Sequence, residues 1–200
     1  IKTKLEQMER NNVITKKMKL FLMTKDPNPG KLKLNRKIHK KTEKNGRYPA
    51  RAYVSGINTA SENIAGLVEY ELQEGVRKLP SYVEDSSDFL RKLEGIGELE
   101  NGEIMFTADI QACYPSIPRK EAKEAMRRNL ESRSDQNIPS GDLLDLADMV
   151  LAGNEIEYEG KRVKQVDGTA IGSKLGKNYA CCSSMLPINT KKRGKRSNEK

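Results

Sequence analysis

The chain is poor in histidine, cysteine and aromatic residues. It contains no tryptophan, one histidine, three cysteines and only 5% aromatic residues among its 200 residues. The single histidine, His39, has no obvious serine or cysteine partner for a catalytic pair, so we expect it to be structural. The cysteines are odd in number and lack the Cys/His spacing of a zinc site, which argues against a disulfide framework and a zinc centre. Reduced thiols in an intracellular compartment are therefore expected.

Long hydrophobic runs are also missing. No stretch approaches the ~20 apolar residues that span a bilayer, and no charged-then-apolar leader opens the chain. The apolar content of 36% is enough for one domain with a core. We expect a soluble, intracellular protein without a membrane partner, in either the nucleus or the cytoplasm.

Charge is abundant but unevenly distributed. Residues 1–50 carry 15 Lys and Arg against 4 Asp and Glu, residues 51–189 carry 16 against 23, and residues 190–200 carry 6 against 1. A basic flank beside an acidic centre suits a protein that handles nucleic acid, because cations neutralise phosphates and carboxylates hold divalent metal ions. The alternative is that the Lys-rich stretches are solvated surface, and we favour it for 191–200.

The segment 104–118 has the pattern of a strand that ends in a carboxylate. Ile104, Phe106, Ala108 and Ile110 alternate with Met105, Thr107 and Asp109. An extended chain would therefore place Asp109 on the face opposite this apolar set. This pattern predicts a strand anchored in a core, with Asp109 offered to a cleft. The alternative is an ordinary edge strand that ends in a turn at the following prolines.

A glycine-rich segment follows at 165–180. Gly168 and Gly172 are four residues apart, and Gly176 stands at what resembles a helix start. Such glycines allow a backbone to approach a ligand closely. Neither the dinucleotide fingerprint nor the phosphate-loop motif is present.

Apolar periodicity predicts the other elements of an α+β chain. We expect a helical segment within 1–25 that is interrupted at Asn11-Asn12, and a helix over 86–95 that buries Phe89, Leu90 and Leu93. The remaining expected elements are paired strands over 32–38 and 48–54 around an Asn-Gly turn, helices over 61–80, 116–133 and 140–151, and a hairpin over 155–166 about Glu159-Gly160.

Taken together, four segments resemble the reverse transcriptases, in particular those of Penelope-like retroelements. Segments 104–118 and 165–180 are similar to polymerase motifs A and B of that family. Residues 37–40 (Lys-Ile-His-Lys) and 51–56 (Arg-Ala-Tyr-Val-Ser-Gly) are similar to its Pro-Lys-Ile-His-Lys and Arg-Pro-Ile-Val-Ser-Gly. The resemblance implies partial fingers and palm of a right-hand polymerase, an α+β fold with an antiparallel sheet and packed helices.

The resemblance also implies a division of the chain and a set of partners. Residues 1–30 would form an N-terminal helical segment, 31–102 a fingers-like region, 103–182 a partial palm, and 183–200 a basic disordered tail. The implied partners are an RNA or DNA template-primer and deoxynucleoside triphosphates.

The roles of individual residues are carried over from the family's motifs. Asp109 is implied to be catalytic and to hold Mg²⁺ together with the carbonyl oxygen of Ile110. Tyr114 is implied to pack under the sugar and exclude a 2′ hydroxyl, while Lys37 and Arg51 would hold the triphosphate. The other implied nucleotide-binding residues are Gln165, Gly168, Thr169, Ala170 and Gly172.

The chain departs from the family pattern at several points. Asp167 stands where a polar or basic residue is common, and Lys177 stands where a proline is common. No Asp-Asp pair follows motif B, and one carboxylate cannot hold two metal ions. We therefore expect a fragment of a reverse transcriptase, truncated after motif B and inactive alone. The alternatives are a non-catalytic nucleic-acid-binding retroelement relic and an unrelated basic scaffold with a protein partner.

Overall fold

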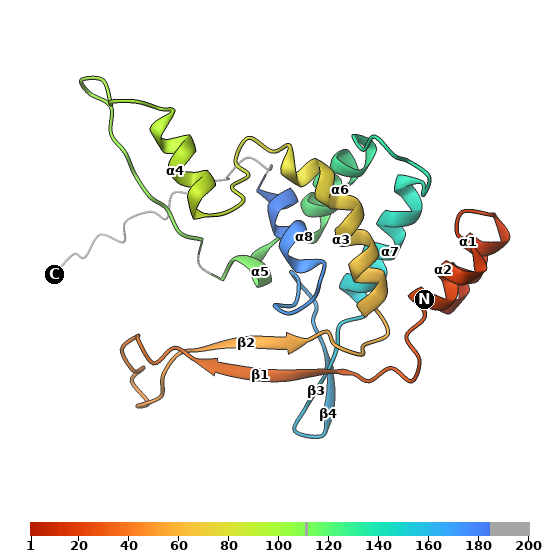
Figure 1. Ribbon diagram of the computed structural model, residues 1–200. Coiled ribbons are helices and arrows are strands. Elements are labelled where there is room, and N and C mark those ends of the chain that lie inside the picture. Colours follow the sequence, from red (N-terminus) through yellow and green to blue (C-terminus); the bar gives the residue numbers. More distant parts are fainter. Residues whose placement is uncertain (111, 185–200) are drawn as a thin grey trace.

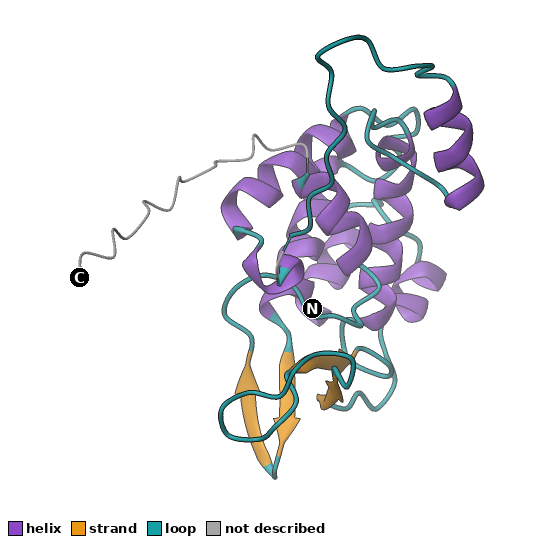
Figure 2. Cartoon of the chain, turned by 90° about the vertical axis from the view of Figure 1, so that its left-hand side faces the viewer, coloured by secondary structure: helices purple, strands orange, loops and turns teal. Residues whose placement is uncertain are grey.

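A computed structural model describes residues 1–110 and 112–184 of the chain. These residues form eight helices and one four-stranded sheet, which confirms the expected α+β class (Figure 1). Most of the helices gather in one layer with the strands beside them, while the helix over 86–94 stands apart (Figure 2). The elements are α1 (Lys2–Arg10), α2 (Lys16–Leu22), β1 (Gly30–Arg36), β2 (Ala50–Ser55), α3 (Glu62–Arg77), α4 (Ser86–Glu94), α5 (Cys113–Ser116), α6 (Arg119–Glu131), α7 (Ser140–Ala152), β3 (Glu155–Tyr158), β4 (Lys161–Lys164) and α8 (Gly176–Ser183).

Helix α3 is the centre of the core and packs against α6, α7 and α8. Its apolar residues recur at helical spacing, and Ile64, Val68, Leu72 and Val76 are fully buried. The helices expected over 61–80 and 140–151 are thus confirmed as α3 and α7. In the described part of the chain, no helix is both long and apolar enough to cross a membrane.

The N-terminal helical segment is divided where the sequence predicts. Helix α1 ends before Asn12, which adopts a positive φ of 57°, and the hydroxyl of Thr15 accepts a hydrogen bond from the backbone of Met18 to cap α2. The ammonium of Lys4 ties α1 to α7 through Asp142 at 2.8 Å and Asp145 at 2.7 Å.

The sheet is mixed, with strand order β2-β1-β3-β4, so the expected antiparallel sheet is wrong in one pairing. Strands β1 and β2 pair antiparallel, as do β3 and β4, but β3 joins β1 in parallel at Gly30 and Lys31. The cause is the connection between them, because the chain passes through the helical layer before it returns to the sheet in the same direction.

Both expected hairpins form. The distal loop between β1 and β2 turns at 43–47, where Gly46 has a positive φ of 74°. The β3–β4 turn holds Glu159 and Gly160 at φ values of 49° and 72°, which is the pattern of a type I′ turn.

The strand expected over 104–110 is not formed, and the burial expected for its apolar residues is wrong. Residues 103–110 have no regular secondary structure, and Ile104 and Phe106 are 83% and 82% exposed. Helix α4 forms as predicted, with Asp85 as its N-cap, but Phe89 and Leu90 are exposed and Leu93 is only partly buried. Amphipathicity predicts the helical conformation of α4. Strand pairing and burial, however, both need a partner surface that these residues do not meet in the described chain.

The helix expected over 116–133 forms as α6 but begins later than expected. Ser116 is instead the last residue of the short helix α5, and α6 begins at Arg119 after Pro118. A residue that precedes proline is disfavoured in helical conformation, so Ile117 adopts an extended one and separates the two helices. The predicted inner face is confirmed, since Ala122, Ala125, Met126 and Leu130 are buried.

The C-terminal tail was expected to begin at Ser183, but Ser183 is the last residue of helix α8. Most of the expected tail, residues 185–200, lies outside the described chain.

A buried guanidinium gives the first prediction. Arg133 donates to the carbonyl oxygens of Leu130 and Ile138 at 2.8 Å each, and it pairs with Glu71 of α3. We expect Glu71→Ala to lower the free energy of unfolding by about 3 kcal/mol, because it leaves a buried charge without its partner. Urea denaturation measures this change. The control is Lys78→Ala, which removes the solvent-exposed pair with Glu74 and should change stability far less. Equal effects of the two substitutions would contradict the prediction.

Candidate functional site

The glycine-rich segment forms a bend, residues 165–175, that lies against the turn at Tyr114. The backbone N–H of Thr169 donates to the carbonyl oxygen of Tyr114 at 3.0 Å. A Cβ atom on Gly168 would stand only 2.3 Å from that carbonyl oxygen, and one on Gly176 would stand 3.1 Å from Cε1 of the Tyr114 ring. The absence of side chains at these positions therefore lets the glycine bend approach the tyrosine.

The same bend also lies against the edge of β2. The N–H of Val54 donates to the carbonyl oxygen of Ile171 at 2.9 Å. Gly172 has a φ of 112°, and a Cβ there would meet the carbonyl oxygen of Val54 at 2.3 Å and the ring of Tyr53 at 2.8 Å. Ala170 packs with Val54 and Ile156 in a second small core. The bend thus joins the helical layer to the sheet.

Arg119 holds the glycine bend in place from the start of α6. Its Nε donates to the carbonyl oxygen of Gly168 at 3.2 Å, and one terminal nitrogen donates to Leu151 at 2.9 Å and Gln165 at 3.2 Å. The fixed fork of donors on a guanidinium suits such a set of carbonyl oxygens. Sequence reasoning missed this residue, because its carbonyl partners lie at least 32 positions away.

The side chain of Gln165 makes hydrogen bonds that stabilise the bend. Its side-chain amide donates to the carbonyl oxygen of Asp167 at 2.8 Å and accepts from the amide of Asn154 at 3.4 Å. This glutamine, expected to contact nucleotide, therefore makes contacts within the bend and to the start of β3.

The bend residues differ in their accessibility. Gly168, Thr169 and Ala170 are buried, and the hydroxyl of Thr169 has no hydrogen-bond partner among the described residues. Gly172 is exposed. Of these four expected nucleotide contacts, only Gly172 is open to a ligand in this conformation, and the other three pack within the protein.

Tyr114 is half-buried between the bend and α8. Burial raises the pKa of its phenol, and the nearby thiols of Cys181 and Cys113 add to the shift. Burial also raises the pKa of Cys182 to about 12. The phenol and the Cys182 thiol are therefore uncharged at neutral pH, and the ring of Tyr114 offers an uncharged surface beside the bend.

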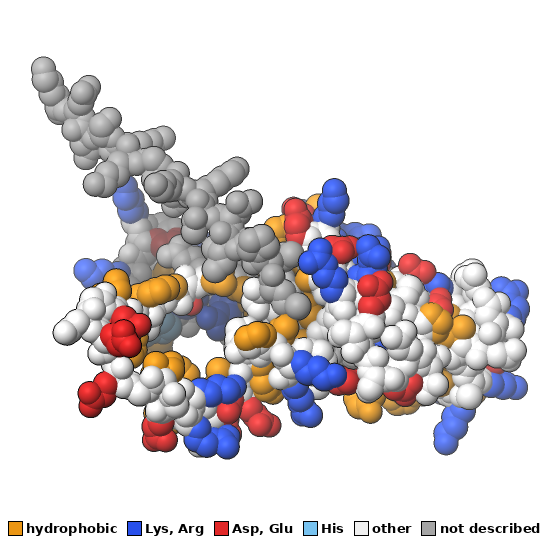
Figure 3. All heavy atoms as spheres, turned by 90° about the horizontal axis from the view of Figure 1, so that it is seen from above, with side chains coloured by type: hydrophobic (Ala, Val, Ile, Leu, Met, Phe, Trp, Pro, Cys, Tyr) orange, Lys and Arg blue, Asp and Glu red, His pale blue; other side chains and the backbone are white. Residues whose placement is uncertain are grey.

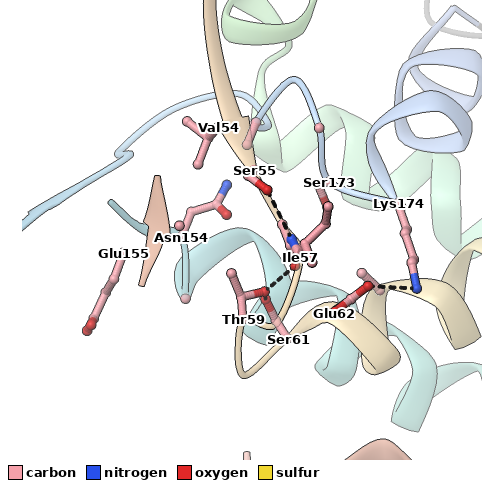
Figure 4. A pocket seen from close by; sticks show the side chains of 16 residues that line it. Val54, Ser55, Ile57, Thr59, Ser61, Glu62, Asn154, Glu155, Ser173 and Lys174 are labelled. Carbon is pink, nitrogen blue, oxygen red and sulfur yellow. Dashed lines mark hydrogen bonds and ion pairs between the residues drawn. The ribbon is translucent and has the colours of Figure 1, made fainter. Parts of the chain in front are cut away.

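A small cavity lies behind the exposed edge of the bend (Figure 4). Lys174 of the bend pairs with Glu62 at 3.1 Å, and the N–H of Asn58 donates to the same carboxylate at 2.6 Å. These contacts, the hydrogen bond from Asn58 first, lower the pKa of Glu62. The cavity volume of about 50 Å³ has room for a few water molecules, whereas ligand pockets measure roughly 300–1,000 Å³. This cavity is therefore too small for a nucleotide.

The basic residues expected to hold a triphosphate lie on the β1–β2 hairpin. Arg51 of β2 is paired in register with Asn35 and is exposed. Lys37 follows β1 directly, and its N–H donates to the carbonyl oxygen of Pro49 at 2.8 Å. Both therefore belong to one hairpin, as the sequence predicts, and this hairpin extends from the bend along β2 (Figure 1).

Asp109 and Ile110 stand apart from these contacts. Both are exposed on the extended segment that follows α4. Within residues 1–110 and 112–184, no group of three or more His, Cys, Asp or Glu side chains is placed to hold a metal ion. One exposed carboxylate does not match the ligand set of a two-metal site, so the described residues do not fit the expected Mg²⁺ pair.

The close approach of the bend to Tyr114 gives a second prediction. We expect Gly168→Ala to cost clearly more stability than Gly160→Ala, measured by urea denaturation. Both glycines have a left-handed φ, 62° and 72°, which costs an alanine about 1–2 kcal/mol. A Cβ at Gly160 would meet nothing within 4 Å, while one at Gly168 would collide with backbone. Similar losses at the two positions would show that the close contact does not exist in solution.

The chain matches no family model, no curated protein and no solved structure.

Proposed function

We propose that this chain is a reverse-transcriptase-type unit that binds a nucleic-acid template-primer and a deoxynucleoside triphosphate. A single observation supports this proposal. The segments 51–56, 104–118 and 165–180 resemble separate polymerase motifs, and part of each lies at the glycine bend, where Thr169 is hydrogen-bonded to Tyr114 and Ile171 is hydrogen-bonded to Val54. Contact between segments so far apart in the sequence is not required by chain connectivity, so it supports a common site.

Each exposed part of this junction suits one part of a nucleotide. The Tyr114 ring offers an apolar edge for a sugar, and the exposed backbone of Gly172 offers a surface for a base. The hairpin residues Lys37 and Arg51 supply positive charge for phosphates, and guanidinium can bind a phosphate with two parallel hydrogen bonds. Binding would follow the open surface, since the cavity behind the bend is too small.

Strand synthesis in this family uses two Mg²⁺ ions, which supply the charge that activates the attacking and leaving oxygens. The described residues contribute one exposed carboxylate toward such a site, Asp109. The proposed function for these residues is therefore to bind and orient template, primer and nucleotide. A nucleic-acid-binding relic without nucleotide affinity is the alternative, and nucleotide titration separates the two.

The hairpin charges give a third prediction. We expect the double variant Lys37→Ala/Arg51→Ala to bind an RNA–DNA hybrid more weakly and with a shallower dependence on salt, because fewer phosphate counterions are released. Fluorescence anisotropy at several salt concentrations measures both quantities. The matched control, Arg127→Ala/Arg128→Ala, also removes two positive charges but from α6, where both residues pair with Glu124. If the control weakened binding equally, only net charge would matter and the hairpin would not be a specific contact.

The ring of Tyr114 gives a fourth prediction. We expect the wild-type chain to bind a fluorescent deoxynucleoside triphosphate more tightly than its ribonucleotide counterpart, and Tyr114→Ala to reduce this preference by about tenfold, or about 1.4 kcal/mol. The cause would be loss of the ring that excludes a 2′ hydroxyl. The control Tyr70→Ala removes an exposed tyrosine of α3 and should keep the preference. If the wild-type chain bound nucleic acid but bound neither the deoxynucleotide nor the ribonucleotide, the result would favour the alternative, a nucleic-acid-binding relic without nucleotide affinity.

A further inference from the structure

Residues 86–110, which we term the apolar arm, expose an unusual number of large apolar side chains. The arm consists of α4 and the segment that leads from it toward α5 (Figure 1). No residue of α4 is buried. Figure 3 shows hydrophobic side chains around a hollow on the side of the molecule to which the arm belongs. The apolar residues that are at least 47% exposed are Phe89, Leu90, Ile96, Leu99, Ile104, Met105, Phe106 and Ile110.

The end of the arm also has an unpaired backbone. No backbone hydrogen bond joins residues 104–110 to any other part of the described chain. Such a segment, with strand-forming residues and free N–H and C=O groups, is a template for pairing with another strand. The nearby edge of β2 is not fully available to it, because Val54 already donates to Ile171 there.

We propose that residues 104–110 pair with the same residues of a second copy of this chain. The two segments would run antiparallel around a two-fold axis at Thr107. This register places Ile104 opposite Ile110, Phe106 opposite Ala108, and Met105 opposite Asp109.

The sequence is self-complementary in this register. Ile104, Phe106, Ala108 and Ile110 of both copies share one face of the paired strands, so the apolar side chains meet across the pair. Asp109 of one chain lies opposite Met105 of the other chain and not opposite the second Asp109, so two like charges do not face each other. A shift by one residue would place Phe106 opposite Thr107 in one direction and opposite Asp109 in the other.

Helix α4 can supply the cover that a pair of strands needs. A two-stranded ribbon is only marginally stable in water unless a helix or further strands pack against it. The apolar stripe of α4 contains Phe89, Leu90 and Leu93, and the chain between helix and strand contains Gly95, Gly97 and Gly102, of which the last two have positive φ. Each phenylalanine can bury roughly 150–250 Å². The four in two copies, with the surrounding aliphatic side chains, approach the ~1,200–2,000 Å² of a stable interface.

The proposed association does not depend on nucleotide or nucleic-acid binding. In the paired strands Asp109 lies on the face opposite Phe106, and neither the glycine bend nor the hairpin cations take part. Failure of either proposal therefore leaves the other intact.

The first test measures the mass of the full chain by size-exclusion chromatography with light scattering over a wide concentration range. We expect a dimer that dissociates on dilution. Phe106→Glu should give a monomer at every concentration while circular dichroism stays unchanged, because this side chain is exposed in the single chain. The control Ile57→Glu changes another exposed apolar residue, which is 75% exposed and lies outside the arm, and should keep the dimer. A wild-type chain that is always monomeric, or a dimer that survives Phe106→Glu, would overturn the proposal.

The second test determines the register. Residues directly opposite each other in antiparallel strands have Cβ atoms ~4.5–5.5 Å apart, close to disulfide geometry. Thr107→Cys should therefore form a 107–107 cross-link under mild oxidation, identified as the linked peptide by mass spectrometry. Met105→Cys is the control, because the two copies of residue 105 would be four positions apart along the strands, roughly 13 Å. Equal cross-linking at both positions, or none at 107, would overturn the register and with it the proposal.

Discussion

The close contact between the glycine bend and the Tyr114 turn is the constraint on which the rest of the structure depends. At Gly168 the backbone has a positive φ and passes so near the Tyr114 carbonyl that no side chain fits between them. The adjacent N–H of Thr169 uses this approach to donate to the same carbonyl oxygen. Because the contact joins backbone to backbone, it fixes the relative position of α5 and the bend without a specific side chain from the tyrosine turn.

The helical core makes this contact possible, and the contact in turn positions the sheet. Leu175 and Tyr179 are fully buried and fix the beginning of α8, so the bend enters the helical layer in one orientation. Arg119 holds the other end of the bend through three carbonyl oxygens from two parts of the chain. Since Ala170 then packs against Val54 and Ile156, the position of the sheet follows from the helices.

Local patterns in the sequence predict much of this fold but not its long-range contacts. The periodic apolar residues of α3 and α7, the Asn12 break and the Glu159-Gly160 turn all form as expected, because each depends on neighbours in sequence. Residues 104–110 show equally clear alternation without forming a strand, because pairing requires a partner that alternation cannot specify. The contacts of Arg119 could not be predicted for the same reason, because its carbonyl partners lie far away in the sequence. The motifs imply that Tyr114, Gly168, Thr169 and Ala170 all bind nucleotide, but they predict neither the backbone contact between Tyr114 and Gly168 nor the burial of Thr169 and Ala170.

Burial of the small residues changes what the glycine-rich motif means in this chain. Gly168, Thr169 and Ala170 serve the packing of the bend, so the proposed selectivity for a nucleotide would rest on the half-buried Tyr114, the exposed Gly172 and the hairpin cations. Asp109 belongs to a different structural unit, since it lies on the arm and shares no described contact with the bend. Its position relative to Tyr114 therefore depends on what holds residues 104–110 in place. Strand pairing, which fixes every second side chain on one face, would order this carboxylate more firmly than any contact it makes in the single chain.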